Sequence, residues 1–343
     1  MSERLTLEKI GELAGVSRAT VSRVINDHPN IRPEVRQRVL DVIAETGYQP
    51  NQAARSLASK RTGLLGLVIP RVVQSLFTDP YYPRLIQGVS QACNESGHTL
   101  SLFIFHTEDD EQQLAPQVTR QGFLDGVIIA GVQRHDPLLP LLLRTNTPFV
   151  VIGEPLDEPQ ASFVDVDNRG GAYTAVSHLI TLGRRRIATI TGQLEMAAGQ
   201  HRRQGYLDAL QAHGLPVAET LIQQGDFEYE RAYQATLALL PHKPDAIFAA
   251  SDSMAWAALR ALAEAGVQVP AAVAVVGFDD LATVGTAVPF GSPTLSTVRQ
   301  PIHRIGVLAV ETLVDIIKQP QAAPRRVILP TELIIRESCG GRA

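Results

Sequence analysis

The sequence predicts a small all-α head joined through a short hinge to a much larger two-lobed α/β core. Three observations predict this fold class. Two short helical patterns broken by a glycine turn occupy residues 6–26. From Gly63 onward, short β-branched runs such as GLLGLVIP and GVIIAG alternate with helical stretches, which is typical of a parallel sheet covered by helices. This pattern restarts near Arg185, and the stretch is too long for one compact sheet, so we expect two lobes.

The head begins with a helix-turn-helix pattern, TLEKIGELAGVSRATVSRVIN. Apolar residues recur at helical spacing on both sides of the turn at Gly15: Leu7, Ile10 and Leu13 before it, and Val21, Val24 and Ile25 after it. The polar face of the second segment carries donors suited to base edges and phosphates in a DNA major groove: Ser17, Arg18, Ser22, Arg23 and Asn26. Taken alone, these residues fit an ordinary amphipathic helix pair equally well.

A third helix and a hinge follow the recognition pattern. Pro33 suits the first turn of a helix and Gly47 suits its end, so we expect a three-helix head of about fifty residues. Residues 51–58 are rich in alanine but allow only about two helical turns, which is too short for a stable isolated helix. We predict that this segment folds when it is held against DNA or a twin segment, and a plain linker is the alternative.

Composition excludes several protein classes. No apolar run approaches the roughly 18 to 20 residues of a membrane span, and the polar start MSERLTLEKI lacks the features of a signal peptide. Cys93 and Cys339 lie far apart without metal-ligand spacing, so we expect no disulfide scaffold, metal or cofactor. No G-x-S-x-G, P-loop, G-x-G-x-x-G or H-E-x-x-H pattern indicates an enzyme. We therefore expect a cytoplasmic protein without catalytic activity.

Charge divides unevenly between the head and the core. The net charge is −4, but residues 1–62 hold ten Lys and Arg against seven Asp and Glu, while the remainder holds 21 against 28. The head can therefore approach phosphates while the acidic core stays away from DNA.

Six motifs occur in one order along nearly the whole chain: GVSRATVSRVIN, NQAARSL, HRRQGY, AASDSMA, VAVVGFDD and LSTVRQP. In this order they resemble the lac-repressor family of bacterial transcription factors. The resemblance implies a small all-α helix-turn-helix DNA-binding head joined by a hinge helix to a two-lobed α/β periplasmic-binding-protein-like core. It also implies a repressor of carbohydrate-utilisation genes, released from its operator by a sugar in the cleft between the lobes.

The resemblance also implies domain boundaries and crossovers. We expect the DNA-binding head over residues 1–50, the hinge helix and linker over 51–62, and the effector-binding and dimerisation core over 63–338. Three crossovers would assign residues of about 63–166 and 300–320 to the first lobe. The second lobe would take about 167–295 and 325–338, including one last strand over 326–336.

Operator contacts are implied by position in the head and hinge. The resemblance assigns Leu57 to the minor groove, where an apolar side chain kinks the duplex. Two-fold proteins match two-fold sites, so we expect a homodimer on a near-palindromic operator, with an exposed Trp256 near the dimer seam. The expected DNA-binding residues are Thr6, Ser17, Arg18, Ala19, Ser22, Arg23, Asn26, Tyr48, Asn51, Ala54, Arg55 and Leu57.

Polar residues at the ends of predicted strands mark the expected effector site. Ligands of open α/β sheets bind beyond the carboxyl ends of strands, and a carboxylate and a guanidinium suit the hydroxyls of a sugar. Aromatic rings suit its apolar faces. Ser251 stands where the family often has Asn, and its short side chain slightly favours a di- or oligosaccharide. The expected effector residues are Phe77, Tyr81, Tyr82, Arg202, Phe227, Ser251, Asp252, Asp279 and Gln300.

Two alternatives remain open at this point. A purine-like corepressor would tighten DNA binding instead of releasing it. A sugar-binding transport protein would share the core fold, but the head argues against it.

Overall fold

The computed structural model describes residues 5–25, 28–48, 61–70, 80–105, 115–120, 122–281 and 291–341. The chain divides into two compact units, Met1–Thr62 and Gly63–Ala343. Six predicted site residues lie outside the described residues: Asn26, Asn51, Ala54, Arg55, Leu57 and Phe77.

The head contains the three predicted helices, α1 (Leu7–Ala14), α2 (Arg18–Ile25) and α3 (Pro33–Thr46). Gly15 ends α1 in a left-handed conformation, with φ of 64°, which allows the tight turn into α2. The sequence pattern groups Leu13 with Leu7 and Ile10 in one apolar stripe, but this grouping is wrong for Leu13, because its side chain is 53% exposed. Steps of three residues drift about 120° around a helix between Leu7 and Leu13. Ala14 faces the core in its place, together with Ile10, Val21, Val24, Val39 and Tyr48.

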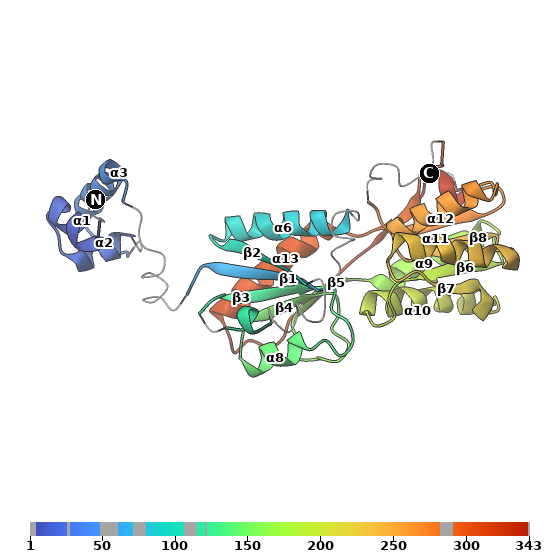
Figure 1. Ribbon diagram of the computed structural model, residues 1–343, viewed down its shortest axis with the longest axis horizontal. Coiled ribbons are helices and arrows are strands. Elements are labelled where there is room, and N and C mark those ends of the chain that lie inside the picture. Colours follow the sequence, from blue (N-terminus) through green and yellow to red (C-terminus); the bar gives the residue numbers. More distant parts are fainter. Residues whose placement is uncertain are drawn as a thin grey trace. The chain divides into compact units, whose positions relative to one another are not determined.

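The first lobe of the core is built on a six-stranded parallel sheet (Figure 1). Its strand order is β11 (Arg326–Leu329), β5 (Phe163–Val166), β4 (Phe149–Ile152), β3 (Gly126–Ala130), β1 (Leu64–Pro70) and β2 (Thr99–Phe105). Helices α6 (Tyr81–Glu95) and α13 (Ile302–Lys318) pack together over one face, and α8 (Leu138–Arg144) lies on the other (Figure 1). The β3 and β4 strands are buried along their whole length, as their continuous apolar sequence predicts.

The second lobe is built on a second six-stranded sheet. Its order is β12 (Glu332–Ile334), β10 (Ser296–Arg299), β9 (Ala274–Asp279), β8 (Ala246–Ala249), β6 (Ile187–Thr191) and β7 (Ile222–Gln224). Only the β10–β12 pair is antiparallel among its described pairs. Two helix pairs cover it, α9 (Asn168–Thr181) with α10 (Ala197–Ala212), and α11 (Tyr229–Leu239) with α12 (Asp252–Glu264). Short 3-10 turns lie at Glu219–Leu221, Leu240–His242 and Glu337–Cys339.

Helices α9 and α12 cover opposite faces of the second sheet. Gly171 of α9 lies against the Phe278 ring, whereas Gly277, the preceding strand residue, lies against Asp252 of α12. Successive strand residues point to opposite faces, so the two helices sandwich β9.

The prediction of one last strand over residues 326–336 in the second lobe is wrong. β11 pairs in parallel with β5 of the first lobe, and β12 pairs in antiparallel fashion with β10 of the second. Pro330 stands between them and has no N–H to continue a ladder. The chain therefore crosses between the lobes three times, after β5, after β10 and after β11.

The prediction of an exposed Trp256 is also wrong. Trp256 lies on α12, is only 3% exposed and packs in the core of its own chain. Helix α12 is buried on almost all sides because it lies between the sheet and α11. Among the described helices, none is long and apolar enough to cross a membrane.

Candidate DNA-reading face and effector site

The candidate DNA-reading face is the exposed side of α2. Ser17 caps this helix, since its Oγ accepts from the Thr20 N–H at 3.2 Å. Ala19 and Arg23 are exposed beside it, and Ser22 is half-buried. Thr6 caps α1 by accepting from Lys9 N at 3.3 Å, and Tyr48 is buried in the head core.

Arg18 lies on the same face and has one defined partner. Its Nη1 lies 3.1 Å from Oε1 of Glu8, and both side chains are more than half exposed. The pKa of the Glu8 carboxyl lies below its ordinary value. The hydrogen bond from the Glu8 backbone N–H is the largest cause, and the positive charge of Arg18 and a hydrogen bond with the Thr6 side chain add to it. Exposed ion pairs are weak, so Arg18 can leave Glu8 for a base edge at small cost.

The candidate effector site is centred on Arg202, which projects from α10 and is 5% exposed. Its Nε donates to Asn168 Oδ1 at 2.8 Å, and its Nη1 donates to the Ala250 carbonyl at 2.6 Å. The same Nη1 lies 3.3 Å from Asp279 Oδ1. The guanidinium also lies 3.7 Å from the centre of the Phe278 ring, a cation–π contact. These contacts hold Arg202 in a single geometry.

Asp279 joins Arg202 to the crossover after β10. Gln300 follows that strand, and its Nε2 donates to Asp279 Oδ1 at 2.5 Å. Asp279 has a φ of 122° and Asp280 a φ of 58°, conformations that few non-glycine residues adopt. Such strained residues persist only where the surroundings hold them, and they gather at functional sites.

Aromatic rings approach this group from both lobes. Tyr81 starts α6 of the first lobe and packs edge-to-face on Tyr82, with 5.3 Å between the ring centres. Burial, the adjacent Tyr82, and the charges of Asp279 and Asp165 all raise the pKa of the Tyr81 hydroxyl. Phe227 of the second lobe stacks over Gly192, where any Cβ would overlap the ring. The Phe227 ring centre lies 5.8 Å from the Arg202 guanidinium.

Ser251 and Asp252 lie next to the site, at the N-terminus of α12. Ser251 Oγ accepts from Met254 N at 3.2 Å and caps α12, and the effect of its short side chain on ligand size stays a prediction. Asp252 is completely buried, with Oδ1 accepting from Thr297 Oγ1 at 2.5 Å and Oδ2 from Leu281 N at 2.7 Å. Burial and the negative charge of Asp279 raise the pKa of the Asp252 carboxyl well above its ordinary value.

Sequence reasoning missed two members of the group, Asp165 and Asn168. Asp165 lies near the end of β5, and its Oδ1 accepts from Asn168 Nδ2 at 2.9 Å. Burial raises the pKa of this carboxyl, and backbone N–H groups of Val166 and Glu154 partly offset that effect. The signal was present, because Asp165 is the penultimate residue of the FVDV strand and Asp279 is the last residue of its own strand.

Several hydrogen bonds join the two lobes around this group. The Gln133 amide of the first lobe donates to Gln193 Oε1 of the second at 3.0 Å. Nearby, Arg134 N donates to the Glu195 carbonyl at 2.7 Å. The structure therefore places Tyr81, Arg202, Phe227, Asp279 and Gln300 together where the lobes meet, with Tyr82, Ser251 and Asp252 adjoining them.

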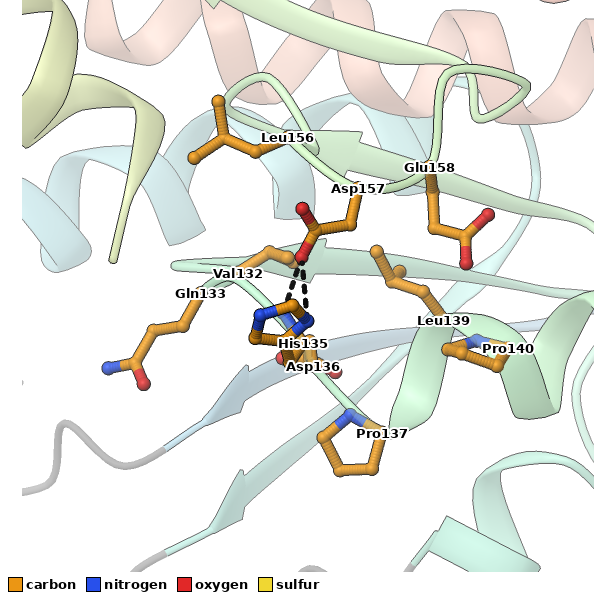
Figure 2. Close-up of a pocket in the computed structure, with 10 residues that line it drawn as sticks. All are labelled: Val132, Gln133, His135, Asp136, Pro137, Leu139, Pro140, Leu156, Asp157 and Glu158. Atoms are coloured by element: carbon orange, nitrogen blue, oxygen red, sulfur yellow. Dashed lines mark hydrogen bonds and ion pairs between the residues drawn. The ribbon is translucent and has the colours of Figure 1, made fainter. Parts of the chain in front are cut away.

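A separate cavity of about 290 Å³ lies in the first lobe, between the loops that follow β3 and β4 (Figure 2). Figure 2 shows His135 facing Asp157, whose Oδ2 accepts from the backbone N–H of His135 at 2.7 Å. Its lining, within the described part of the chain, includes none of the expected effector residues. This cavity is therefore distinct from the candidate effector site.

Comparisons with known proteins cover both units. Residues 6–51 match the bacterial regulatory proteins of the lacI family, and residues 176–339 match the periplasmic binding protein-like domain. The HTH-type transcriptional regulator CelR of Thermobifida fusca is 42% identical over 339 residues, 98% of each chain.

Two solved structures extend this similarity to the whole fold. One is a transcriptional regulator CelR–cellobiose complex, with a TM-score of 0.76 at 40% identity over 98% of this chain and 100% of that one. The other is the lac repressor dimer bound to operator and the anti-inducer ONPF, with a TM-score of 0.82 at 26% identity over 98% and 99%. The chain therefore belongs to the lacI family of bacterial regulatory proteins, which are DNA-binding transcriptional regulators.

Proposed function

We propose that this protein is a homodimeric repressor of carbohydrate-utilisation genes that a neutral di- or oligosaccharide releases from a near-palindromic operator. The observation that carries the proposal is the Asp279 carboxylate, held by Arg202 and Gln300 and flanked by Tyr81 and Phe227. Sugar hydroxyls donate to a carboxylate and accept from a guanidinium, while the C–H faces of a pyranose pack on aromatic rings.

The charge of the site favours a neutral ligand. Three buried carboxylates, Asp165, Asp252 and Asp279, lie near one guanidinium, that of Arg202. The Asp279 carboxylate already faces the Arg202 guanidinium, so an anionic ligand such as a uronate or a sugar phosphate would bring a second negative charge to the same cation. A neutral polyol adds none and supplies the hydroxyl donors that carboxylates accept.

Cellobiose is the first ligand to test, because the CelR relative is described in complex with it. The effector residues themselves support the class of ligand and not the identity of the sugar. A purine-like corepressor remains the second candidate, since the same rings could stack a purine and Asp279 could accept its N–H groups.

We infer a regulator without enzymatic activity. Hydrolysis of a sugar needs a pair of carboxylates that both face the scissile bond. Asp252 instead has each oxygen occupied by a donor of the protein, and Asp165 accepts from two backbone N–H groups and Asn168. The operator is chromosomal DNA, so we place the protein in the cytoplasm.

A thermal-shift panel on the full chain tests the ligand class. A specific ligand raises the unfolding midpoint by mass action, about 2.7 kcal/mol of stabilisation at a hundred times its Kd. We expect cellobiose to raise the midpoint, and glucuronate and hypoxanthine to leave it unchanged. A shift with hypoxanthine alone would replace the sugar effector by a purine, and a shift with glucuronate alone would contradict the charge argument.

A further inference from the structure

Asp280, next to the candidate effector carboxylate, connects three separate parts of the core. Its Oδ2 accepts from Arg299 Nε at 2.7 Å and its Oδ1 from Arg336 Nη2 at 2.6 Å, so the end of β10 and the segment after β12 are both anchored to it. Its backbone carbonyl accepts from Nη1 of Arg84, a residue of the first lobe, at 3.0 Å. A single residue thus joins the effector site to both lobes.

Asp280 holds an unusual backbone conformation that its partners keep in place. Its φ of 58° follows the φ of 122° at Asp279, and the two carboxylates have different partners: Arg202 and Gln300 for Asp279, Arg299 and Arg336 for Asp280. Leu281 N donates to the buried Asp252 immediately afterwards and holds the far side of the bend. Any movement of Asp279 toward a ligand must therefore also move the carbonyl that Arg84 contacts.

On the first lobe, Arg84 belongs to a pair of closely packed helices. Gly88 of α6 lies against the His303 carbonyl of α13, and a Cβ on Gly306 of α13 would lie 2.6 Å from the Leu85 carbonyl of α6. His303 Nε2 and Gln91 Oε1 add a hydrogen bond at 3.0 Å between the same helices. With glycines at both contacts and no room for a side chain, α6 and α13 are expected to move as one body.

This helix pair is attached to the bend at two points. Arg84 of α6 holds the Asp280 carbonyl, and Gln300, two residues before α13, holds the Asp279 carboxylate. Other bonds between the lobes, such as Gln133 to Gln193, do not involve these residues. The α6–α13 pair and the Asp279–Asp280 bend therefore form a hydrogen-bonded connection between the candidate effector site and the first lobe.

We propose that Arg84 and Asp280 are positioning residues that form an interlobe linkage, through which sugar binding at Asp279 is passed to the α6–α13 pair. This inference rests on the proposed function. A ligand shifts a conformational equilibrium only through contacts that differ between the two states. The Arg84–Asp280 bond is one such contact, because it joins groups on different lobes and must break when the lobes separate at this edge.

The test compares the parent with five variants of the full-length protein in an operator-release titration with cellobiose. Arg84→Met removes the donor but keeps the length of the side chain, and Asp280→Asn weakens the pairs with Arg299 and Arg336. Arg304→Met is the matched control, because Arg304 is an exposed residue of α13 whose Nη1 pairs with Glu311 of the same helix at 3.2 Å. The double variant of Arg84 and Asp280 completes the cycle.

We expect each single linkage variant to raise the cellobiose concentration for half-release about threefold to tenfold, the effect of one hydrogen bond. The double variant should exceed the larger single effect by less than twofold, because Asp280→Asn loosens the bend whose carbonyl Arg84 contacts, so both changes weaken one connection. Arg84→Lys should restore much of the response by supplying another donor, and Arg304→Met should behave like the parent.

Three results would overturn the linkage. Arg84→Met could release operator at the parent's cellobiose concentration, or Arg304→Met could be equally affected. The two single effects could also multiply in the double variant, as they would if Arg84 touched the sugar directly. If Asp280→Asn binds operator poorly without sugar, its half-release concentration cannot be compared with that of the parent. The comparison of Arg84→Met with Arg84→Lys then tests the linkage by itself. A parent protein that no tested sugar releases would refute the proposed function, and this inference with it.

Discussion

Replacing Asp279 by alanine removes the carboxylate that lies between Arg202 and Gln300. Breaking a buried ion pair by deleting one partner costs about 3 to 5 kcal/mol when the other charge is left alone. Arg202 would keep two acceptors, Asn168 Oδ1 and the Ala250 carbonyl, and its contact with the Phe278 ring. We therefore expect a smaller loss of unfolding free energy, about 2 to 3 kcal/mol.

The same change should weaken sugar binding more than it weakens the fold. A hydrogen bond from a hydroxyl to a carboxylate contributes about 1.5 to 3 kcal/mol, so losing one raises Kd by about 10- to 100-fold. Operator affinity without sugar should stay within about twofold of the parent, since Asp279 lies in the core and the DNA-reading face lies in the head. The variant should therefore be a repressor that no longer releases its operator.

Asp279→Asn separates the two effects. Asparagine tolerates positive φ and keeps an oxygen that can accept from Gln300, so most of the stability should return. The charge is still lost, so the sugar Kd should remain raised. Calorimetry with cellobiose and chemical denaturation measure the two quantities, and parent-like sugar affinity in Asp279→Ala would refute the assignment of this carboxylate to the effector.

Three further predictions concern other parts of the chain. Arg18→Ala should cost about 1 to 3 kcal/mol on the cognate operator and relax preference at one base pair per half-site; equal loss on random DNA would contradict its role in base reading. The pKa of Asp252 in the folded protein is raised above its unfolded-state pKa of about 4. The folded parent therefore loses stability as pH rises from that unfolded-state pKa through the raised folded-state pKa. Asp252→Asn should therefore gain thermal stability relative to the parent as pH rises above about 4, and a pH-independent difference would count against this. Gly192→Ala should displace the Phe227 ring and weaken sugar binding at least about tenfold, with operator binding unchanged, because its Cβ would occupy the space of the ring; a parent-like sugar Kd by calorimetry would remove Phe227 from the site.

Much of the fold could be predicted because apolar periodicity is a local property. The three helices of the head and the buried β3, β4, β8 and β9 strands follow from their own sequences. The split between β11 and β12 could not be read this way, since their partners lie far away in the sequence. Pro330 indicated a break, but only tertiary pairing decides which sheet each half joins.

The candidate site also contains some residues that the sequence predicts and others that depend on tertiary contacts. Arg202, Asp279 and Gln300 come together because the carboxyl ends of parallel strands meet at one edge, and this rule needs only the order of the elements. Asp165 follows the same rule and could have been found with it. The inward orientation of Asp252 depends on Thr297 and Leu281, which no local pattern reveals.

Coupling between sugar and DNA is the central claim, and an operator titration of the full-length protein with and without saturating cellobiose tests it most directly. Allosteric coupling of about 1 to 3 kcal/mol predicts that cellobiose weakens operator binding about 5- to 150-fold. Binding that is unchanged by every neutral sugar that stabilises the protein, or that becomes tighter when the sugar is added, would contradict it.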